Sequence, residues 1–269
     1  MSAQILLVGC GKMGRAMLDG WLGAGSVTDV AVVEPAGPSV LPTDNRVRHL
    51  SSADGLGADY RPDAIVLAVK PQAMDAVLPA YRDVAGHGAV VLSIAAGKTI
   101  GYFQNQLGQT TAVVRAMPNT PAAIGRGTSV LVAGDGVSQV QRDLASRLMS
   151  AVGSVEWVEE EGLIDAVTAL SGGGPAYVFL LVEALAEAGI AAGLSPEMSM
   201  RLARSTVSGS GALLDASSEP ADILRKNVTS PAGTTEAALR VLMDDDSGIG
   251  PIFRQAIAAA ADRSRELAG

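Results

Sequence analysis

The first 34 residues constrain the fold of this chain more than any other segment does. A short apolar strand is expected at Gln4–Val8, and it is followed by the loop Gly9-Cys10-Gly11-Lys12-Met13-Gly14 and a helical stretch over Arg15–Leu22. A second apolar run, Ala31–Val33, leads to Glu34, twenty residues beyond the last glycine of the loop. A strand, a glycine loop, a helix and a second strand ending in a carboxylate form the fingerprint of a dinucleotide-binding α/β domain. A glycine turn with a purely structural purpose is the alternative.

The three glycines of this loop are expected to have different roles. Gly9 permits a tight turn, Gly11 lets a pyrophosphate approach the backbone, and Gly14 lets the helix pack closely on the strand. The other loop residues predicted to contact the cofactor are Cys10, Lys12 and Met13.

Glu34 bears on the choice of cofactor. A carboxylate at this position accepts hydrogen bonds from both hydroxyls of the adenosine ribose, whereas a 2′-phosphate would meet a like charge. At a separation of ~4 Å this repulsion costs roughly 1 kcal/mol per charge pair in water and ~4 kcal/mol at an effective dielectric constant of 20. The sequence therefore favours NADH, although a Glu34 side chain turned into solvent would leave NADPH usable.

Further apolar runs alternate with helical periodicity along the first half of the chain. They lie at Ala64–Val69, Ala89–Ile94, Thr111–Arg115 and Ser129–Val132. Strands that alternate with helices predict right-handed crossovers and a mostly parallel sheet. We therefore expect residues 1–161 to form one doubly wound, Rossmann-type domain.

Ligands of such sheets bind at the carboxyl ends of the strands. The segment Leu67-Ala68-Val69-Lys70-Pro71 ends one strand and is predicted to contact the cofactor. Lys70 either reaches a ribose or phosphate or is a solvated surface lysine. Ala96 and Gly97, which follow the next strand, are too small to block a nicotinamide ring.

The sequence changes character after Glu161, because no convincing strand follows Leu163. The run Pro175–Ala192 is apolar around nearly its whole circumference, and only Glu183 and Glu187 interrupt it. A helix of this kind must be surrounded by protein. We predict an all-α domain over residues 162–269 that forms a homodimer, with a monomeric bundle burying the same helix as the alternative.

Charge and composition exclude several classes of partner. The net charge is −8 and no block of Lys or Arg occurs, so nucleic acid is not an expected partner. The apolar tract Ala176–Leu194 contains two carboxylates and two glycines and is expected to be a buried helix, not a membrane span. We find no signal peptide at Met1–Ile5, and the single cysteine fits a reducing cytoplasm. No metal site is predicted.

One segment near the C-terminus combines hydroxyls, a glycine and the start of a helix. Thr229-Ser230-Pro231-Ala232-Gly233-Thr234-Thr235-Glu236 precedes the apolar run Ala237–Met243. Such a corner presents backbone N–H groups and hydroxyl donors to an anion, and the helix dipole adds attraction. The segment contains no Lys or Arg, so a bound carboxylate would be held by neutral donors. The alternative is an ordinary helix N-cap with an early proline.

Taken in order, these motifs resemble those of the pyrroline-5-carboxylate reductases over essentially the whole chain. The matching segments are the glycine loop, Val69-Lys70-Pro71, Met117-Pro118-Asn119-Thr120-Pro121, Ser171-Gly172-Gly173-Gly174-Pro175-Ala176-Tyr177, and Val228 through Met243. The last of these is far more specific than the dinucleotide fingerprint. Two departures occur: Gly173 stands where the family often has a serine, and Ser218-Glu219-Pro220 is one residue shorter than usual, so Glu219 is given no catalytic role.

The resemblance implies a function in proline biosynthesis. Members of the family reduce 1-pyrroline-5-carboxylate to L-proline with NADH or NADPH. They join a Rossmann domain to an all-α dimerisation domain like the C-terminal domain of 6-phosphogluconate dehydrogenase, and the dimers assemble into larger rings. Reduction of a cyclic imine requires a hydride at carbon and a proton at nitrogen, and it requires no general base.

Residue roles follow from this resemblance. Thr235 would hydrogen-bond to the imine nitrogen or help to protonate it, while Ser230 and the N–H groups of Gly233 and Thr234 would hold the carboxylate. Asn119 would orient the nicotinamide or the substrate, unless it only forms a turn.

Two other functions fit the same architecture. A β-hydroxyacid dehydrogenase would require a basic lysine or histidine near the substrate, and no lysine occurs from Gly172 through Leu194. A dinucleotide-sensing regulator would use the helical domain only to oligomerise. Ala96, Gly97 and the hydroxyl-rich corner argue against that alternative.

Overall fold

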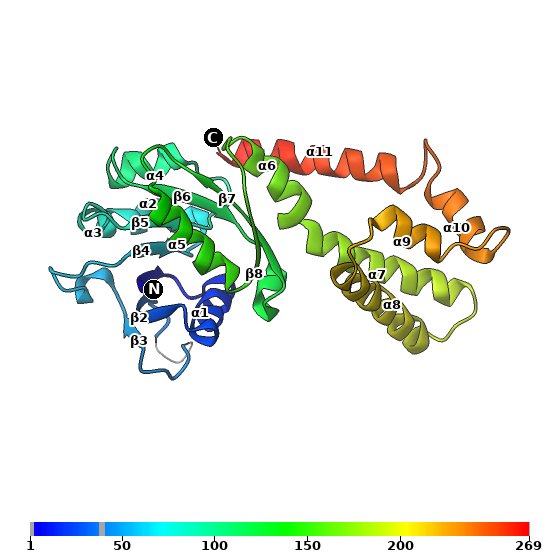
Figure 1. The fold of residues 1–269 in the computed structure, drawn as a ribbon, viewed down its shortest axis with the longest axis horizontal. Helices are drawn as coiled ribbons and strands as arrows, with labels where there is room; N and C mark the ends of the chain where they lie inside the picture. Colours follow the sequence, from blue (N-terminus) through cyan, green and yellow to red (C-terminus); the bar gives the residue numbers. More distant parts are fainter. Residues whose placement is uncertain (1–2, 38–40, 269) are drawn as a thin grey trace. The chain divides into compact units, whose positions relative to one another are not determined.

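The computed structural model describes residues 3–37 and 41–268, and its backbone divides into two compact units (Figure 1). Unit 1 contains residues 1–172 and 260–269, and unit 2 contains residues 173–259. Helix α11 (Ile249–Ala268) begins in unit 2 and ends in unit 1.

Unit 1 is built on an eight-stranded sheet in the order β3-β2-β1-β4-β5-β6-β7-β8. All neighbouring strands run parallel except β6 and β7, which are antiparallel. The order reverses at β1 and β4, where a doubly wound sheet places its ligand. The bounds are β1 (Ala3–Val8), β2 (Val27–Val33), β3 (Val47–Leu50), β4 (Ala64–Leu67), β5 (Val90–Ser93), β6 (Val113–Met117), β7 (Gly127–Ala133) and β8 (Gly153–Trp157). The predicted α/β class is confirmed, while β3 and β8 were not anticipated.

Helices cover both faces of this sheet, which is why the central strands are apolar throughout. On one face, α1 (Lys12–Ala24) and α5 (Gln139–Ser150) pack together, and the fully buried Trp21 donates its indole N–H to Leu148 O at 2.8 Å. On the other face lie α4 (Ile100–Leu107) and the short helical segments between β4 and β5. These segments are α2 (Met74–Val77), α3 (Arg82–Ala85), and the 3₁₀ turns Pro71–Ala73 and Leu78–Tyr81.

The chain leaves the sheet through α6 (Leu163–Val167) and the π-helical segment Thr168–Gly172. Short π-helical segments are rare and occur frequently at functional sites. Both elements belong to unit 1, together with the last turns of α11, where Ser264 Oγ donates to Asp165 Oδ1 at 2.6 Å.

Unit 2 consists of helices only, as the sequence predicts for the described residues beyond Leu163. They are α7 (Gly174–Ala191), α8 (Pro196–Ala216), α9 (Ala221–Asn227), α10 (Thr234–Leu242) and the first part of α11. The closest approach of α7 and α8 is at Gly189, where an added Cβ would lie 2.1 Å from Ser199 Oγ. Ser199 Oγ in turn donates to Ala186 O at 2.6 Å. Within one chain, a Cβ added at Gly209 or Gly211 of α8 would meet nothing within 4 Å.

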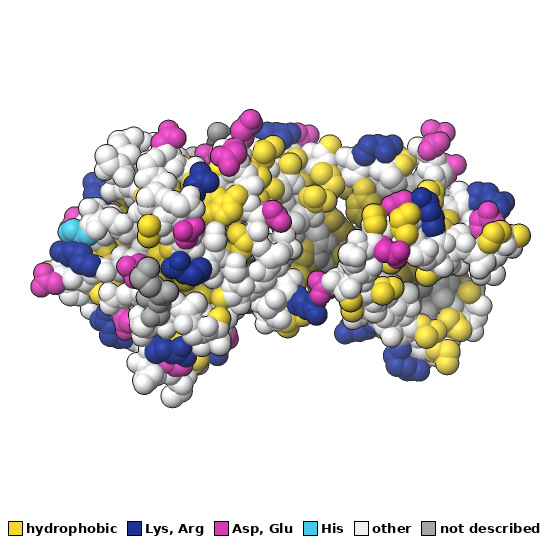
Figure 2. Space-filling view, viewed as in Figure 1, with side chains coloured by type: hydrophobic (Ala, Val, Ile, Leu, Met, Phe, Trp, Pro, Cys, Tyr) yellow, Lys and Arg dark blue, Asp and Glu magenta, His cyan; other side chains and the backbone are white. Residues whose placement is uncertain are grey.

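Helix α7 exposes most of its apolar side chains in the single chain, and the surface of unit 2 is correspondingly rich in hydrophobic atoms (Figure 2). Phe179 and Leu180 are 61% and 62% exposed. Among the described residues, the segment Leu163–Ala191 is long and apolar enough to cross a membrane by length and composition alone. An exposed apolar surface of this kind calls for a partner that covers it. Glu183 and Glu187 lie within the segment, and carboxylates are costly in lipid, so a protein partner is favoured over a membrane.

Candidate functional site

The glycine loop has the geometry that a bound pyrophosphate requires. Gly9 has φ +87°, and an added Cβ would lie 2.7 Å from Val69 Cγ1. An added Cβ at Gly14 would lie 2.5 Å from Gly9 O, whereas one at Gly11 would meet nothing within 4 Å. Two glycines are therefore required by packing, and the third keeps open the space where a phosphate would approach.

The N-terminus of α1 is available to an anion. Its N-cap is Gly11, no side chain caps it, and its first turn contains no acidic residue. The first N–H groups of a helix lack intrahelical acceptors and attract negative charge. Cys10 is buried in this loop, and burial, with a smaller contribution from Glu34, raises the pKa of its thiol to about 11. The thiol is therefore protonated near neutral pH, which argues against a redox role.

Glu34 is held in place beside the loop by five hydrogen bonds, one of which its carbonyl oxygen accepts from Gly37 N at 3.2 Å. Its Oε2 accepts the N–H of Cys10 at 2.8 Å, and its Oε1 accepts the N–H of Ala36 at 2.9 Å. Its own N–H donates to Leu50 O at 3.0 Å, and His49 Nε2 lies 2.8 Å from its carbonyl oxygen. Each carboxylate oxygen keeps lone pairs for a ribose hydroxyl. The carboxylate thus points to the glycine loop and not into solvent.

His49 is half-buried on β3. No short motif marks its contact with Glu34, because β3 is an edge strand and the pairing of β2 with β3 sets the contact.

The segments after β4 and β5 form the next part of the candidate cofactor site. Lys70 is exposed and precedes a 3₁₀ turn that starts with Pro71. Asp75 Oδ1, just beyond this turn, accepts the hydroxyl of Tyr102 at 2.7 Å and so joins it to α4. Burial first, and then this hydrogen bond, raises the pKa of Tyr102 to about 12, so the hydroxyl stays a donor at neutral pH.

Ala96 and Gly97 follow β5 at the carboxyl edge of the sheet. Gly97 has φ +71°, and an added Cβ would lie 3.0 Å from Leu267 O. The last turn of α11 therefore packs on this loop and leaves room for glycine only. The remaining residues predicted to contact the cofactor, Leu67, Ala68 and Val69, lie where β4 ends beside the glycine loop, and Ala68 N donates to Val8 O at 2.8 Å.

Asn119 links the segment after β6 to the glycine-rich segment that starts at Ser171 by a hydrogen bond. Its Nδ2 donates to Ser171 O at 3.1 Å and its Oδ1 accepts the N–H of Thr128 at 2.8 Å, and the residue is 9% exposed. Gly172 packs beside it, since an added Cβ there would lie 2.6 Å from Met117 Cε. The structure thus brings the segment after β6 against the start of the glycine-rich segment, and Asn119 retains only one amide hydrogen for a ligand.

The hydroxyl-rich corner in unit 2 starts α10, as the sequence predicts. Gly233 is the N-cap, and no side chain caps the helix there. Ser230, Thr234 and Thr235 are exposed in the single chain. The N–H groups of Thr234 and Thr235 lack intrahelical acceptors by their position in the helix.

Three N–H groups of the corner are already engaged, the first being that of Thr229, which donates to Lys226 O at 3.0 Å. Gly233 N donates to Ser230 O at 3.0 Å, and Ala232 N, at a residue with φ +58°, donates to Glu236 Oε2 at 2.6 Å. The expected donor at Gly233 therefore closes a turn in the free chain. The donors that remain belong mainly to Thr234 and Thr235.

Cations adjoin the corner although the eight-residue segment has none. A cavity of about 440 Å³ is lined by Thr229 and Glu236 together with Arg225, Lys226 and Arg240. The two basic residues of α9 lie in its last turn, where they also suit the helix dipole. Arg225 and Lys226 lie just before the segment in sequence and Arg240 lies just after it, so sequence reasoning missed them by considering only the eight residues of the segment.

No group of three or more potential metal ligands occurs among residues 3–37 and 41–268. Two further polar residues, the buried Arg115 and the partly buried Glu161, form an ion pair in unit 1 at 3.0 Å. Neither was predicted to matter, because they are 46 residues apart in sequence.

Comparison with known proteins gives consistent matches over both units. The family model for pyrroline-5-carboxylate reductase dimerisation matches residues 161–267, and that for coenzyme F420-dependent NADP oxidoreductase matches residues 4–97. A pyrroline-5-carboxylate reductase of Mycobacterium tuberculosis is 39% identical over 98% of this chain and 97% of its own length. One from Pseudomonas aeruginosa is 46% identical over 77% of this chain and 75% of its own length.

Solved structures agree with these matches. The pyrroline-5-carboxylate reductase of Coxiella burnetii superimposes with a TM-score of 0.92 at 33% identity, covering 100% of both chains. The Plasmodium falciparum enzyme, solved with NADP bound, gives a TM-score of 0.79 at 28% identity, with 99% of this chain and 98% of that chain covered. The dimerisation model includes α7, so self-association accounts for the apolar surface that the single chain exposes.

Proposed function

Because this chain belongs to the pyrroline-5-carboxylate reductase family, it reduces 1-pyrroline-5-carboxylate to L-proline with a nicotinamide cofactor, and we propose that it prefers NADH. The observation that carries this preference is the double anchoring of the Glu34 carboxylate to the N–H groups of Cys10 and Ala36. An anchored carboxylate beside the ribose site cannot withdraw from a 2′-phosphate without breaking both bonds. The Plasmodium falciparum relative was solved with NADP bound, so both cofactors are compared in the test below.

The cofactor would be held by residues of unit 1. The N–H groups at the start of α1 suit the pyrophosphate, Glu34 suits the ribose, and Lys70 suits a ribose or phosphate oxygen. Ala96 and Gly97 leave space for the nicotinamide. When bound, the reduced nicotinamide supplies the hydride for the imine carbon.

The substrate would be held at the corner of unit 2. Ser230, Thr234 and Thr235 offer hydroxyl and N–H donors to a carboxylate, and Gly233 shapes the turn that presents them. Hydrogen bonds to charged groups contribute roughly 1.5–3 kcal/mol each. Two or three would supply the ~4 kcal/mol that corresponds to millimolar binding. The corner needs no cation for binding of this strength.

Thr235 donates to the imine nitrogen in this proposal. The hydroxyl polarises the C=N bond, and the proton that the nitrogen gains as the hydride reaches carbon passes through this hydroxyl and is replaced from solvent. The remaining acceleration comes from holding the two reactants in contact. Asn119 acts as an orienting residue through its one remaining amide hydrogen and through its hold on Ser171. Residues 162–269 form the proposed substrate-binding and dimerisation domain.

Assembly and location belong to the same proposal. The dimer would cover the apolar groove of about 420 Å³ on α7 and α8, lined by Val178, Phe179, Val182, Met200 and Val207. Dimers would assemble further into a ring, with light scattering as the test. The lone, protonated cysteine suits the cytoplasm.

The test of function follows the loss of reduced-nicotinamide absorbance when NADH and pyrroline-5-carboxylate are mixed with the protein. Turnover of the imine, at a higher kcat/KM with NADH than with NADPH, is the expected result. Turnover of β-hydroxyacids alone would identify a dehydrogenase of that class. Tight NADH binding without either reaction would identify a cofactor sensor.

A further inference from the structure

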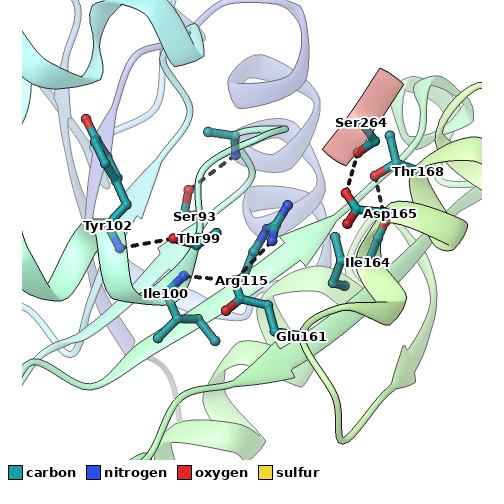
Figure 3. Close-up of polar contacts among 11 residues, drawn as sticks. Ser93, Thr99, Ile100, Tyr102, Arg115, Glu161, Ile164, Asp165, Thr168 and Ser264 are labelled. Atoms are coloured by element: carbon teal, nitrogen blue, oxygen red, sulfur yellow. Dashed lines mark hydrogen bonds and ion pairs between the residues drawn. The ribbon is translucent and has the colours of Figure 1, made fainter. Parts of the chain in front are cut away.

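An ion pair in unit 1, with a buried arginine and a partly buried carboxylate, joins three separate segments of the chain (Figure 3). Arg115 lies on β6, and its Nη1 is 3.0 Å from Glu161 Oε1. The same oxygen accepts the N–H of Ile100, the first residue of α4, at 2.8 Å. The Arg115 side chain is 4% exposed, and the Glu161 side chain is 30% exposed.

This pair is a costly way to stabilise a fold. Arg115 Nη2 is buried and has no acceptor among the described residues. Removing the Arg115 guanidinium from water offsets much of what its ion pair gains, and apolar replacements of such pairs are often neutral or stabilising. An unsatisfied buried donor adds to the cost and calls for an explanation other than stability.

The position of the pair supplies that explanation. Ile100 directly follows the segment Ala95–Thr99, which contains the proposed nicotinamide wall. The segment is fixed at its start, where Ala95 N donates to Ser93 Oγ at 3.2 Å. Its end is fixed where Tyr102 N donates to Thr99 Oγ1 at 3.1 Å and where Glu161 caps Ile100.

The segments that carry Arg115 and Glu161 also connect to parts of the proposed active site. Arg115 lies four residues before Asn119, in the middle of β6, the strand that leads into the Met117–Pro121 segment. Glu161 lies two residues before α6, whose Asp165 receives Ser264 from the last turns of α11. One carboxylate oxygen therefore links the nicotinamide wall, the strand that positions Asn119, and the start of the helical segment.

We propose that Arg115 and Glu161 are positioning residues for imine reduction, which hold the Ala95–Thr99 wall in the conformation that aligns the nicotinamide with the substrate. The inference rests on the proposed function, in which Ala96 and Gly97 face the nicotinamide. Neither residue is expected to touch substrate or cofactor. The effect of losing the pair should therefore fall on kcat and not on NADH affinity, which the glycine loop and Glu34 largely determine.

The decisive variant replaces both partners with apolar residues, Arg115→Met together with Glu161→Leu. Because this removes the two charges and the unsatisfied donor together, we expect a melting temperature equal to or above that of the wild type. We expect the NADH dissociation constant, from quenching of protein fluorescence, to stay within about twofold. We expect kcat to fall about 10- to 100-fold, since misplacements of about 1 Å cost up to that much. The kinetic isotope effect on kcat with NADH deuterated at C4 should rise, because hydride transfer becomes slower.

A graded variant separates positioning from folding. Glu161→Gln keeps an oxygen that can accept the Ile100 N–H and loses the charge, so its kcat should lie between those of the wild type and Glu161→Leu. The matched control replaces an exposed Arg–Glu pair on α11 in the same way, Arg263→Met with Glu266→Leu. It should leave kcat and the isotope effect unchanged.

Each outcome decides one claim. Native-like kcat and isotope effect in the Arg115→Met, Glu161→Leu protein would overturn the positioning role, even if its stability changed. A fall in NADH affinity equal to the fall in kcat/KM, with kcat intact, would also overturn it. If the wild type itself does not turn over the imine, the proposed function fails and this inference falls with it.

Discussion

Replacing Glu34 tests the basis of cofactor selection most directly. In Glu34→Gln the side chain keeps its length and one oxygen, while the negative charge is lost. The amide can satisfy only one of the two N–H groups, at Cys10 and Ala36, that the carboxylate accepts. Any resulting damage to the loop affects NADH and NADPH alike. The ratio of kcat/KM for NADPH to that for NADH is therefore the quantity to measure.

The expected size of the change follows from two contributions. Removing the repulsion of a 2′-phosphate at ~4 Å is worth about 1–4 kcal/mol per charge pair, depending on the effective dielectric constant. The bond to the ribose 2′-hydroxyl, which only NADH has, weakens by about 1 kcal/mol when its acceptor loses the charge. The smallest sum is about 2 kcal/mol, which corresponds to an increase in the ratio of about 30-fold.

Initial rates with saturating imine and varied cofactor give the ratio. Glu156→Gln is the matched control, because it removes one unit from the same net charge of −8 at an exposed site on the edge strand β8. Glu34→Ser, which also makes room for a phosphate, should raise the ratio at least as far. A ratio within about threefold of the wild type in both Glu34 variants, with native melting temperatures, would refute the electrostatic argument.

Four further predictions concern other parts of the molecule. Thr235→Ala should lower kcat by about 10- to 100-fold and leave the NADH dissociation constant unchanged, with recovery in Thr235→Ser; an unaltered kcat would remove Thr235 from the mechanism. Gly11→Ala should keep the wild-type melting temperature but lose NADH affinity, because its methyl group would enter only the space kept for the cofactor. Gly14→Ala should melt several degrees lower, since its Cβ would lie 2.5 Å from a backbone oxygen. Equal melting temperatures of the two variants would contradict this prediction. Burial raises the pKa of Cys10 from 9.0 to about 11 in the folded state, so the unfolded thiol ionises first as the pH rises. The free energy of unfolding, measured by urea titration, should therefore fall between about pH 9 and pH 11 by more in the wild type than in Cys10→Ala. An equal fall in both proteins would exclude this linkage. Phe179→Asp should convert dimers to monomers in light scattering, because Phe179 is 61% exposed on α7, and a persistent dimer would place the interface elsewhere.

Sequence reasoning succeeded where a local requirement dictates the residue. The three glycines of the loop and Glu34 occupy positions that backbone sterics and charge define, and the strands at the centre of the sheet are continuous apolar runs. The missed strands are both at the edges. In β3, Arg48 and His49 interrupt the apolar pattern, and in β8 polar residues alternate with apolar ones over only five residues.

The less predictable features depend on contacts between distant segments. His49 reaches Glu34 only because β3 pairs with β2, and Arg115 reaches Glu161 only through the fold of unit 1. The corner before α10 was placed correctly as a helix start. The N–H groups of Gly233 and Ala232 form hydrogen bonds within the turn. These bonds depend on local backbone angles, which the residue types alone do not specify.

The last turn of α11 has a consequence for how the protein is made. Leu267 covers Gly97, so the nucleotide-binding unit contains two stretches of the chain that are separated in sequence by unit 2. A nascent chain leaves the ribosome N-terminus first, and this unit therefore completes its packing only after α11 has emerged. A fragment that stops at Gly172 would leave the loop beside Gly97 uncovered, so that surface needs α11 to be native.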